Sequence, residues 1–228
     1  MALRRGRTVV RAWIAGGTCL VLVAVVVVLT QEGRSGSSTD AGPRPVVTYI
    51  GDSWTAATGS ESGRGYAAPA AERVGWTSHV LGISGTGYLQ GAPGQSFAGR
   101  IGRAAGTDPD VVVVQGSLND DRSDLAALEP AVRDTLSDLR AAVDPGTVVL
   151  VIGASHTPGT DPATIESLND AIGSAAEAVG VRFVDPAGEN WNDPADPTIW
   201  ADPIHHNDGG YRLIADHVSE LLRESIQG

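Results

Sequence analysis

Lysine is absent from the 228-residue sequence, and cysteine occurs once, at Cys19. A single cysteine excludes an intrachain disulfide framework and a metal site built from several cysteines. The absence of lysine excludes the GxxxxGK[ST] loop, whose ammonium group contacts nucleotide phosphates. Beyond Asp202 and His205, the sequence shows no grouping of His, Asp and Glu with metal-ligand spacing. We therefore expect neither a metal nor a cofactor.

Positive charge is also scarce, because 16 arginines stand against 27 acidic residues and the net charge is −11. The first 43 residues contain five arginines and two acidic residues and carry +3, so the remainder carries −14. Phosphate backbones are bound by clustered basic side chains. A folded part this acidic is not expected to bind nucleic acid. The hydrophobic fraction of 42% is that of an ordinary folded protein and excludes wholesale disorder.

One long apolar run, Trp13–Leu29, follows four arginines near the N-terminus. As a helix it is just long enough to span a hydrocarbon core of roughly 30 Å. We interpret residues 1–30 as a signal-anchor or a cleaved signal peptide, and the length of the run favours the anchor. Residues 31–44 are rich in Gly, Ser and Pro and are predicted to be a flexible linker. Because arginines before such a run stay in the cytoplasm, the domain predicted over 45–228 should lie outside it, anchored to the membrane or secreted.

Short apolar runs alternate with amphipathic segments along the rest of the chain. Strands are predicted over 46–50, 79–83, 111–115, 147–153 and 181–185. Helices are predicted over 64–74, 96–105, 123–143, 164–179 and 209–226. The third run, VVVVQ, is continuous, which is typical of a parallel strand buried on both faces. This alternation predicts an α/β fold with a mostly parallel five-stranded sheet.

Four short polar motifs follow these runs or precede the last helix. They are Gly51-Asp52-Ser53, Ser84-Gly85, Gly116-Ser117-Leu118-Asn119, and Asp202 with His205 three residues later. Ligands on open α/β sheets bind beyond the carboxyl ends of the strands, which is where the first three motifs lie. Each motif is common by itself, but this order at these places is hard to obtain by chance.

On these motifs, the segment 46–217 resembles the SGNH hydrolase superfamily, also called GDSL esterases and lipases. The resemblance implies a flavodoxin-like three-layer α/β/α sandwich. The site residues that it implies are the nucleophile Ser53, the catalytic pair Asp202 and His205, and the oxyanion-hole donors Ser53, Gly85 and Asn119. The family usually has an asparagine a few residues before the glycine of its second motif, and this chain has Gly82 near that place.

The chemistry accounts for these residue types. A serine hydroxyl is a weak nucleophile and needs an adjacent base, which His205 would supply while Asp202 holds its tautomer. The backbone N–H groups of Ser53 and Gly85 and the amide of Asn119 would stabilise the oxyanion. A side chain at Gly85 is expected to obstruct the substrate carbonyl.

Structural interpretations compete with each of these roles. Ser53 could be a helix N-cap, Asn119 could form an Asx-turn, and Gly85 could be an ordinary turn residue. His206 is a rival base, although the spacing from Asp202 favours its neighbour. The residues expected to have only structural, turn or surface roles are Asp52, His79, Asp120, His156 and His217.

The leading hypothesis is a serine esterase that hydrolyses short-chain carboxylic esters, including O-acetyl groups on carbohydrate, through an acyl-Ser53 intermediate. Its substrate would be a small molecule or a glycan, and the membrane would be contacted only through the N-terminal segment. Trp54, Trp191 and Trp200 could form aromatic walls for a sugar ring or an acyl chain, or could simply pack in the core. The alternatives are an O-acyltransferase with the same acyl-enzyme, a lipid-ester hydrolase, and a non-catalytic carbohydrate-binding module.

Overall fold

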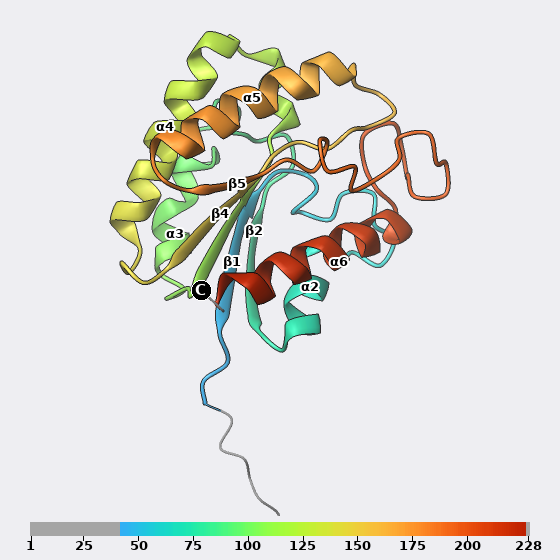
Figure 1. Cartoon of the computed structure of the whole chain (residues 1–228). Coiled ribbons are helices and arrows are strands. Elements are labelled where there is room, and N and C mark those ends of the chain that lie inside the picture. Colours follow the sequence, from blue (N-terminus) through green and yellow to red (C-terminus); the bar gives the residue numbers. More distant parts are fainter. Residues whose placement is uncertain (1–41, 227–228) are drawn as a thin grey trace, which may run out of the picture. The chain divides into compact units, whose positions relative to one another are not determined.

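The computed structural model describes residues 42–226, and the unit that contains the sheet begins at Pro43 (Figure 1). The predicted signal segment and most of the predicted linker lie outside the described residues. Within residues 42–226, no helix has the length and apolar character needed to cross a membrane.

Five parallel strands form one sheet in the order β2-β1-β3-β4-β5. Their bounds are β1 Val46–Gly51, β2 Thr77–Gly82, β3 Val111–Gln115, β4 Val148–Ile152 and β5 Arg182–Val184. This order is that of flavodoxin-like doubly wound folds, so the predicted fold class is confirmed. The edge strand β2 begins two residues before the predicted 79–83, because its polar, partly exposed start carries no apolar signal.

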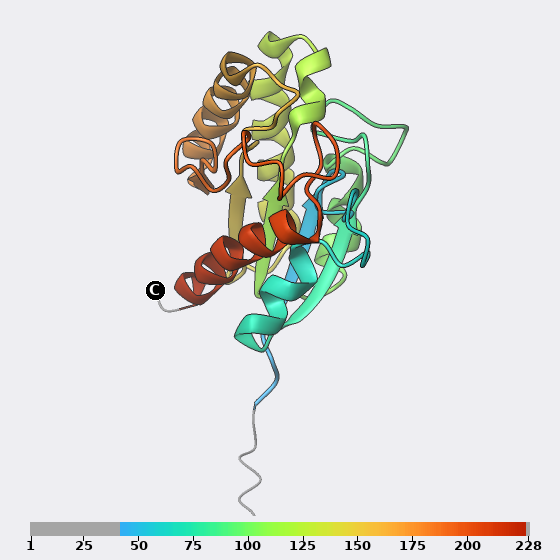
Figure 2. The ribbon, with the colours of Figure 1, turned by 90° about the vertical axis from the view of Figure 1, so that its right-hand side faces the viewer.

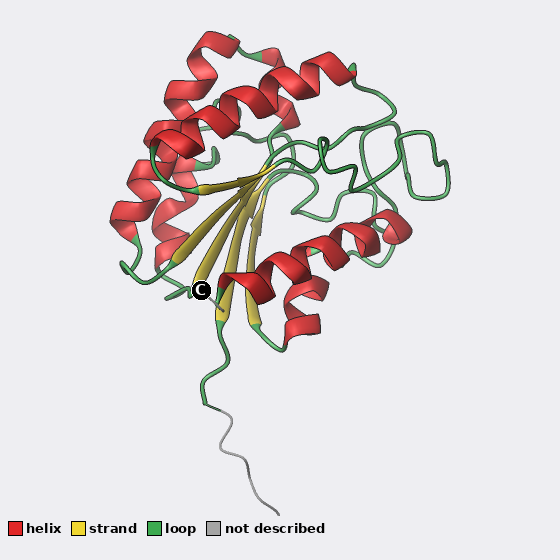
Figure 3. Cartoon of the chain, viewed as in Figure 1, coloured by secondary structure: helices red, strands yellow, loops and turns green. Residues whose placement is uncertain are grey.

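In the part of the chain that the structure describes, five α-helices connect and cover the strands. They are the red ribbons of Figure 3. Their bounds are α2 Ala67–Val74, α3 Ile101–Ala105, α4 Leu125–Ala142, α5 Pro162–Ala178 and α6 Asp208–Ser225. Side chains of Asp124, Asp161 and Asn207 accept backbone N–H bonds at the first turns of α4, α5 and α6. Sequence reasoning missed two 3₁₀ turns, at Ala98–Arg100 and Leu118–Arg122. The first of them shortens the helix predicted over 96–105 to Ile101–Ala105.

The sheet is the middle of three layers. Helices α2 and α6 cover one face, and α3, α4 and α5 cover the other (Figures 1 and 2). Strand β3 explains this arrangement, because Val111 and Val113 pack with the first group while Val112 and Val114 pack with the second. All four valines are fully buried, as the continuous VVVVQ run predicted.

The register of the parallel strands brings the chain out of the sheet at one level. Gly51, the last residue of β1, pairs with Gly82 at the end of β2 and with Gln115 at the end of β3. The loops that follow these three strands therefore begin side by side, and they carry the first three motifs.

Candidate active site

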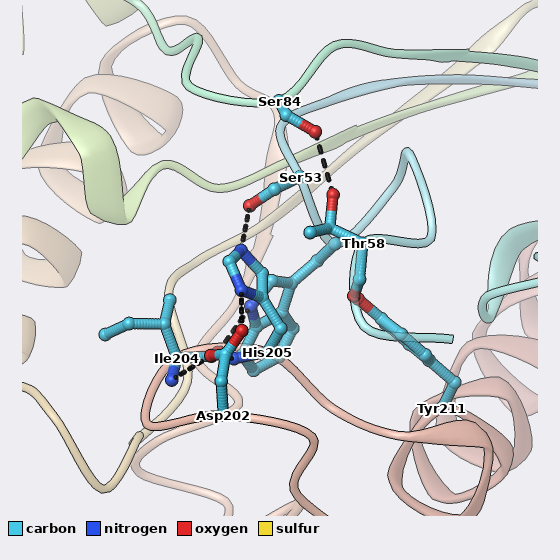
Figure 4. A network of polar contacts seen from close by, with 8 residues as sticks. Ser53, Thr58, Ser84, Asp202, Ile204, His205 and Tyr211 are labelled. Atoms are coloured by element: carbon cyan, nitrogen blue, oxygen red, sulfur yellow. Dashed lines mark hydrogen bonds and ion pairs between the residues drawn. The ribbon is translucent and has the colours of Figure 1, made fainter. Parts of the chain in front are cut away.

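Ser53 lies in a tight turn directly after β1 (Figure 4). The turn is closed by bonds from Ala56 N to Asp52 O and from Thr58 N to Ser53 O, both 2.9 Å. The carboxylate of Asp52 accepts a bond of 2.9 Å from Trp54 N. No helix begins at Ser53, since the next one starts at Ala67, so the serine is not a helix N-cap.

A continuous chain of hydrogen bonds links Ser53, His205 and Asp202 (Figure 4). Ser53 Oγ is 3.0 Å from His205 Nε2, and His205 Nδ1 is 2.8 Å from Asp202 Oδ2. The other oxygen of Asp202 accepts backbone bonds of 2.8 Å from Ile204 and His205. Burial raises the pKa of Asp202, but these hydrogen bonds outweigh that effect and hold the pKa below its usual range. The carboxylate is therefore ionised at neutral pH and oriented toward the imidazole.

The structure places His205, rather than its neighbour His206, against Ser53. His206 is fully buried, its Nδ1 contacts Ile199 O at 3.1 Å, and burial lowers its pKa to about 4. Its ring stacks on Trp200 at 4.0 Å and lies 4.5 Å from the ring of Trp54. His206 is thus a neutral packing residue inside the loop that carries Asp202.

Trp54 joins this loop to the turn that carries Ser53. Its indole Nε1 donates to Ile204 O at 3.0 Å, between Asp202 and His205. Tyr211 in α6 makes a second link, because its hydroxyl donates to Thr58 O at 2.6 Å (Figure 4). These two contacts tie the loop that carries His205, and helix α6 after it, to the turn that carries Ser53.

Gly85 and Asn119 lie in the same cavity as Ser53 and His205. The cavity measures about 340 Å³. The amide Nδ2 of Asn119 donates to Thr86 O at 2.9 Å, which fixes the amide next to the Gly85 loop. Asn119 N also donates to Ser117 Oγ at 3.0 Å, so the side chain of Ser117, rather than that of Asn119, caps the 3₁₀ turn Leu118–Arg122.

The backbone gives a reason for glycine at position 85 besides the expected one. A Cβ placed there would meet no protein atom within 4 Å, so the protein itself leaves space for a side chain. The backbone has φ +76°, a left-handed conformation that side chains disfavour. Conformation rather than crowding by the protein requires this glycine.

Gly82, the departure from the family pattern, has a different reason. A Cβ at this position would lie 2.3 Å from Ala56 N and 2.5 Å from the carbonyl carbon of Thr55. The end of β2 therefore packs directly on the backbone of the turn that carries Ser53. This close backbone contact leaves no room at position 82 for an asparagine side chain.

Two buried carboxylates brace these loops, as expected of turn residues. Asp120 accepts bonds from Tyr88 N at 2.9 Å and Leu89 N at 3.0 Å, which ties the loop after Gly85 to the turn that carries Asn119. Burial raises the pKa of Asp120, and burial likewise raises the pKa of Asp52 to about 6.

The tryptophan prediction needs correction for two of the three residues. Trp54 lines the cavity, but Trp191 and Trp200 are not among its lining residues. Trp191 is buried, stacks on His217 at 4.6 Å and packs in the core beneath α6. Trp200 stacks on His206 instead of facing the cavity. Of the two roles that the sequence left open for Trp191 and Trp200, the structure shows packing.

Sequence reasoning also missed part of the cavity wall. The missed lining residues include Thr58, Ser84, Arg122, Gly159 and Thr160. The hydroxyls of Thr58 and Ser84 are 2.8 Å apart at its edge (Figure 4). The sequence singled out Ser84 only as the neighbour of Gly85. Gly159 and Thr160 come from the loop after β4, where the sequence shows no motif. Among residues 42–226, no group of three His, Cys, Asp or Glu is placed to hold a metal ion.

The chain matches known proteins over most of its length. The model of the GDSL-like lipase/acylhydrolase family matches residues 49–213. A GDSL lipase of Mycobacterium tuberculosis is 33% identical over 193 residues, which cover 80% of this chain and 83% of the relative.

Solved structures share the fold. A family two carbohydrate esterase from Clostridium thermocellum, in complex with cellohexaose, has TM-score 0.67 and 18% identity, covering 82% of this chain and 66% of that one. A salicylyl-acyltransferase from a tetracycline biosynthetic pathway has TM-score 0.61 and 17% identity, covering 82% of this chain and 56% of that one.

The close contact at Gly82 predicts a specific loss of stability. Gly82→Ala should lower the free energy of unfolding by about 1–3 kcal/mol, because the new methyl group overlaps backbone atoms. It should also lower esterase activity, since the displaced segment 55–56 follows the serine. Gly102→Ala is the matched control, because a Cβ there has open space within helix α3, and it should be neutral or stabilising by about 0.5–1 kcal/mol. Urea unfolding measures both, and equal effects would contradict the prediction.

The raised pKa of Asp52 predicts a pH-dependent stability difference. The folded pKa is about 6 and the unfolded value is about 3.9, so the folded state binds this proton more tightly. The resulting stabilisation is fully present below about pH 4 and is lost as pH rises through about 6. Asp52→Asn should therefore gain stability relative to the wild type between pH 4 and pH 7, by up to roughly 3 kcal/mol. Urea unfolding at several pH values, with exposed Asp134→Asn as control, tests this, and a pH-independent difference would refute it.

Proposed function

Because the chain belongs to the GDSL-like lipase/acylhydrolase family and is an ester hydrolase, we propose that it cleaves short-chain carboxylic esters through an acyl-Ser53 intermediate. We propose O-acetyl groups on carbohydrate as the natural substrate class. The observation that carries the proposal is the hydrogen-bond chain from Asp202 through His205 to Ser53, which opens on a cavity shared with Gly85 and Asn119.

In the first half of the proposed reaction, Ser53 Oγ attacks the ester carbonyl carbon and His205 Nε2 takes the serine proton. The carbonyl oxygen becomes an oxyanion, which the N–H groups of Ser53 and Gly85 and the amide of Asn119 would bind. The intermediate then expels the alcohol, which receives the proton from His205, and the acyl group remains on the serine.

In the second half, water enters and His205 takes a proton from it as the water oxygen attacks the acyl carbon. Collapse of this second intermediate breaks the bond to Ser53 Oγ, which recovers its proton from His205. Asp202 stays ionised throughout and stabilises the imidazolium. The carboxylic acid and the alcohol are the products.

The polar side chains in the cavity wall support a polar alcohol portion of the ester. Thr58, Ser84, Thr160 and Arg122 line it, and these side chains can hydrogen-bond sugar hydroxyls. The curated relative is called a GDSL lipase, so lipid esters are the competing substrate class. The competing classes differ in the length of acyl chain that the cavity must accept.

An ester panel combined with active-site labelling tests this proposal. Nitrophenyl acetate and butyrate should be cleaved with higher kcat/KM than octanoate and palmitate, and acetylated xylan should release acetate. A serine-reactive phosphonate should label Ser53, as shown by peptide mapping. Ser84→Ala, which removes the other serine hydroxyl that lines the cavity, should still be labelled. Labelling elsewhere would overturn the acyl-Ser53 mechanism, and a preference for palmitate would favour lipid esters.

Removal of the Asn119 amide tests the oxyanion hole. Asn119→Ala should lower kcat by roughly 10²–10³, equivalent to about 2.7–4 kcal/mol of transition-state stabilisation. Ser117→Ala is the matched control, because Ser117 Oγ donates to the same Thr86 O at 3.1 Å without being an expected oxyanion donor. Its loss of kcat should be at least about tenfold smaller than that of Asn119→Ala. Near-normal turnover by Asn119→Ala would contradict the role of this residue as an oxyanion donor.

A further inference from the structure

Arg100 is a buried cation that the proposed reaction does not use directly. It ends the 3₁₀ turn Ala98–Arg100, and it is only 1% exposed. Within residues 42–226 it forms no ion pair, although Asp52 is near enough to affect its pKa. Its guanidinium lies over the ring of Phe97 at 5.0 Å. Burying a charge costs free energy, so the contacts that Arg100 makes must offset the cost of its burial.

The guanidinium donates hydrogen bonds to four oxygens. Nη1 donates to Gly51 O at 2.6 Å and also to Leu81 O. Nη2 donates to Thr86 Oγ1 at 2.9 Å, and Nε donates to Ser96 O at 3.3 Å. A planar fork with five N–H donors can bridge several backbone segments at fixed angles, which the compact ammonium group of lysine cannot do.

Three of these oxygens belong to the segments that carry the oxyanion donors. Gly51 ends β1, two residues before Ser53. Leu81 lies in β2, just before the loop that contains Gly85. Thr86 follows Gly85 directly, and its backbone oxygen accepts the amide of Asn119 at 2.9 Å. One side chain therefore connects, directly or through Thr86, all three parts of the expected oxyanion hole.

We propose that Arg100 is a positioning residue for the oxyanion hole, which sets the spacing of the donors at Ser53, Gly85 and Asn119. The inference rests on the proposed function, because the three donors matter together only if an oxyanion forms. An oxyanion hole works when its donors lie 2.7–3.1 Å from the developing charge, and a misplacement of about 1 Å can cost roughly 10²-fold in rate. Arg100 touches no reacting atom and acts only through Gly51, Leu81 and Thr86.

The first test compares Arg100→Lys with Arg103→Lys in the full-length protein. Both changes keep the charge, but Arg103 is exposed on helix α3 and serves as the control. Arg100→Lys should lower kcat for nitrophenyl acetate by about 10–10²-fold with KM within about twofold of wild type. Arg103→Lys should leave both constants unchanged. Rates are expressed per site titrated with the phosphonate, so that unfolded protein does not contribute.

A double-mutant cycle separates positioning from general support of the fold. The cycle compares the loss of kcat that Arg100→Lys causes in the wild type with the loss that it causes in the Asn119→Ala variant. If Arg100 acts through the oxyanion hole, the second loss should be at least about tenfold smaller than the first. Equal losses in the two backgrounds would overturn the proposal. Should Arg100→Lys fail to fold, Thr86→Val removes the hydroxyl that accepts the Nη2 bond and should show the same loss of kcat and the same non-additivity.

The outcomes also distinguish this proposal from the proposed function. If the phosphonate does not label Ser53, the acyl-enzyme mechanism itself fails. If Ser53 is labelled and Asn119→Ala is slow while Arg100→Lys keeps wild-type kcat, only the positioning role of Arg100 is wrong.

Discussion

Parallel pairing of β1 with β2 and β3 is the constraint on which the site depends. Because Gly51 pairs with both Gly82 and Gln115, the three strands end level and release their loops at one edge of the sheet. A register shift of one residue would also reverse the faces to which the β3 valines point, so the two hydrophobic layers hold the register. The same packing that stabilises the fold thus brings the first three motifs together.

The loop that carries His205 is not held by the sheet, and other contacts must position it. Aromatic stacking around His206, the indole bond from Trp54 to Ile204 O and the capping of α6 by Asn207 hold the ends of this loop. A neutral His206 suits this role, because a charged imidazole would have to be desolvated among aromatic rings. The two adjacent histidines therefore have opposite environments within one short loop.

Polar groups are concentrated beneath the site at some cost in stability. The carboxylates of Asp52 and Asp120 and the guanidinium of Arg100 are all buried. Burial raises the pKa of both carboxyl groups and lowers the pKa of the arginine, and both directions favour the neutral form. Apolar residues would pack there without this desolvation cost. Their hydrogen bonds to backbone groups hold irregular loops in place, which hydrophobic contacts cannot do with the same directionality. Loops held in this way are what the proposed oxyanion hole would need.

Much of this protein could be predicted from its sequence, because the relevant signals are local. The VVVVQ run specified a doubly buried parallel strand, and the alternation of runs and helices specified the α/β class. The motif spacing selected His205 over His206, and Gly85 was recognised as a position that requires glycine. Even here the reason for that glycine, a positive φ, required the backbone.

Only the tertiary structure decided which residues far apart in the sequence meet. Ser53 and His205 are 152 positions apart, and no local pattern gives the 3.0 Å between their side-chain atoms. Arg100 and Arg103 are indistinguishable in the sequence, yet one is buried on backbone oxygens and the other is exposed. Trp54 and Trp191 are both buried in the same hydrophobic cluster, but only Trp54 also lines the cavity. Local propensity depends on neighbours along the chain. Burial and hydrogen-bond partners depend instead on how the loops and layers pack, and only that packing decided which of these residues face the cavity.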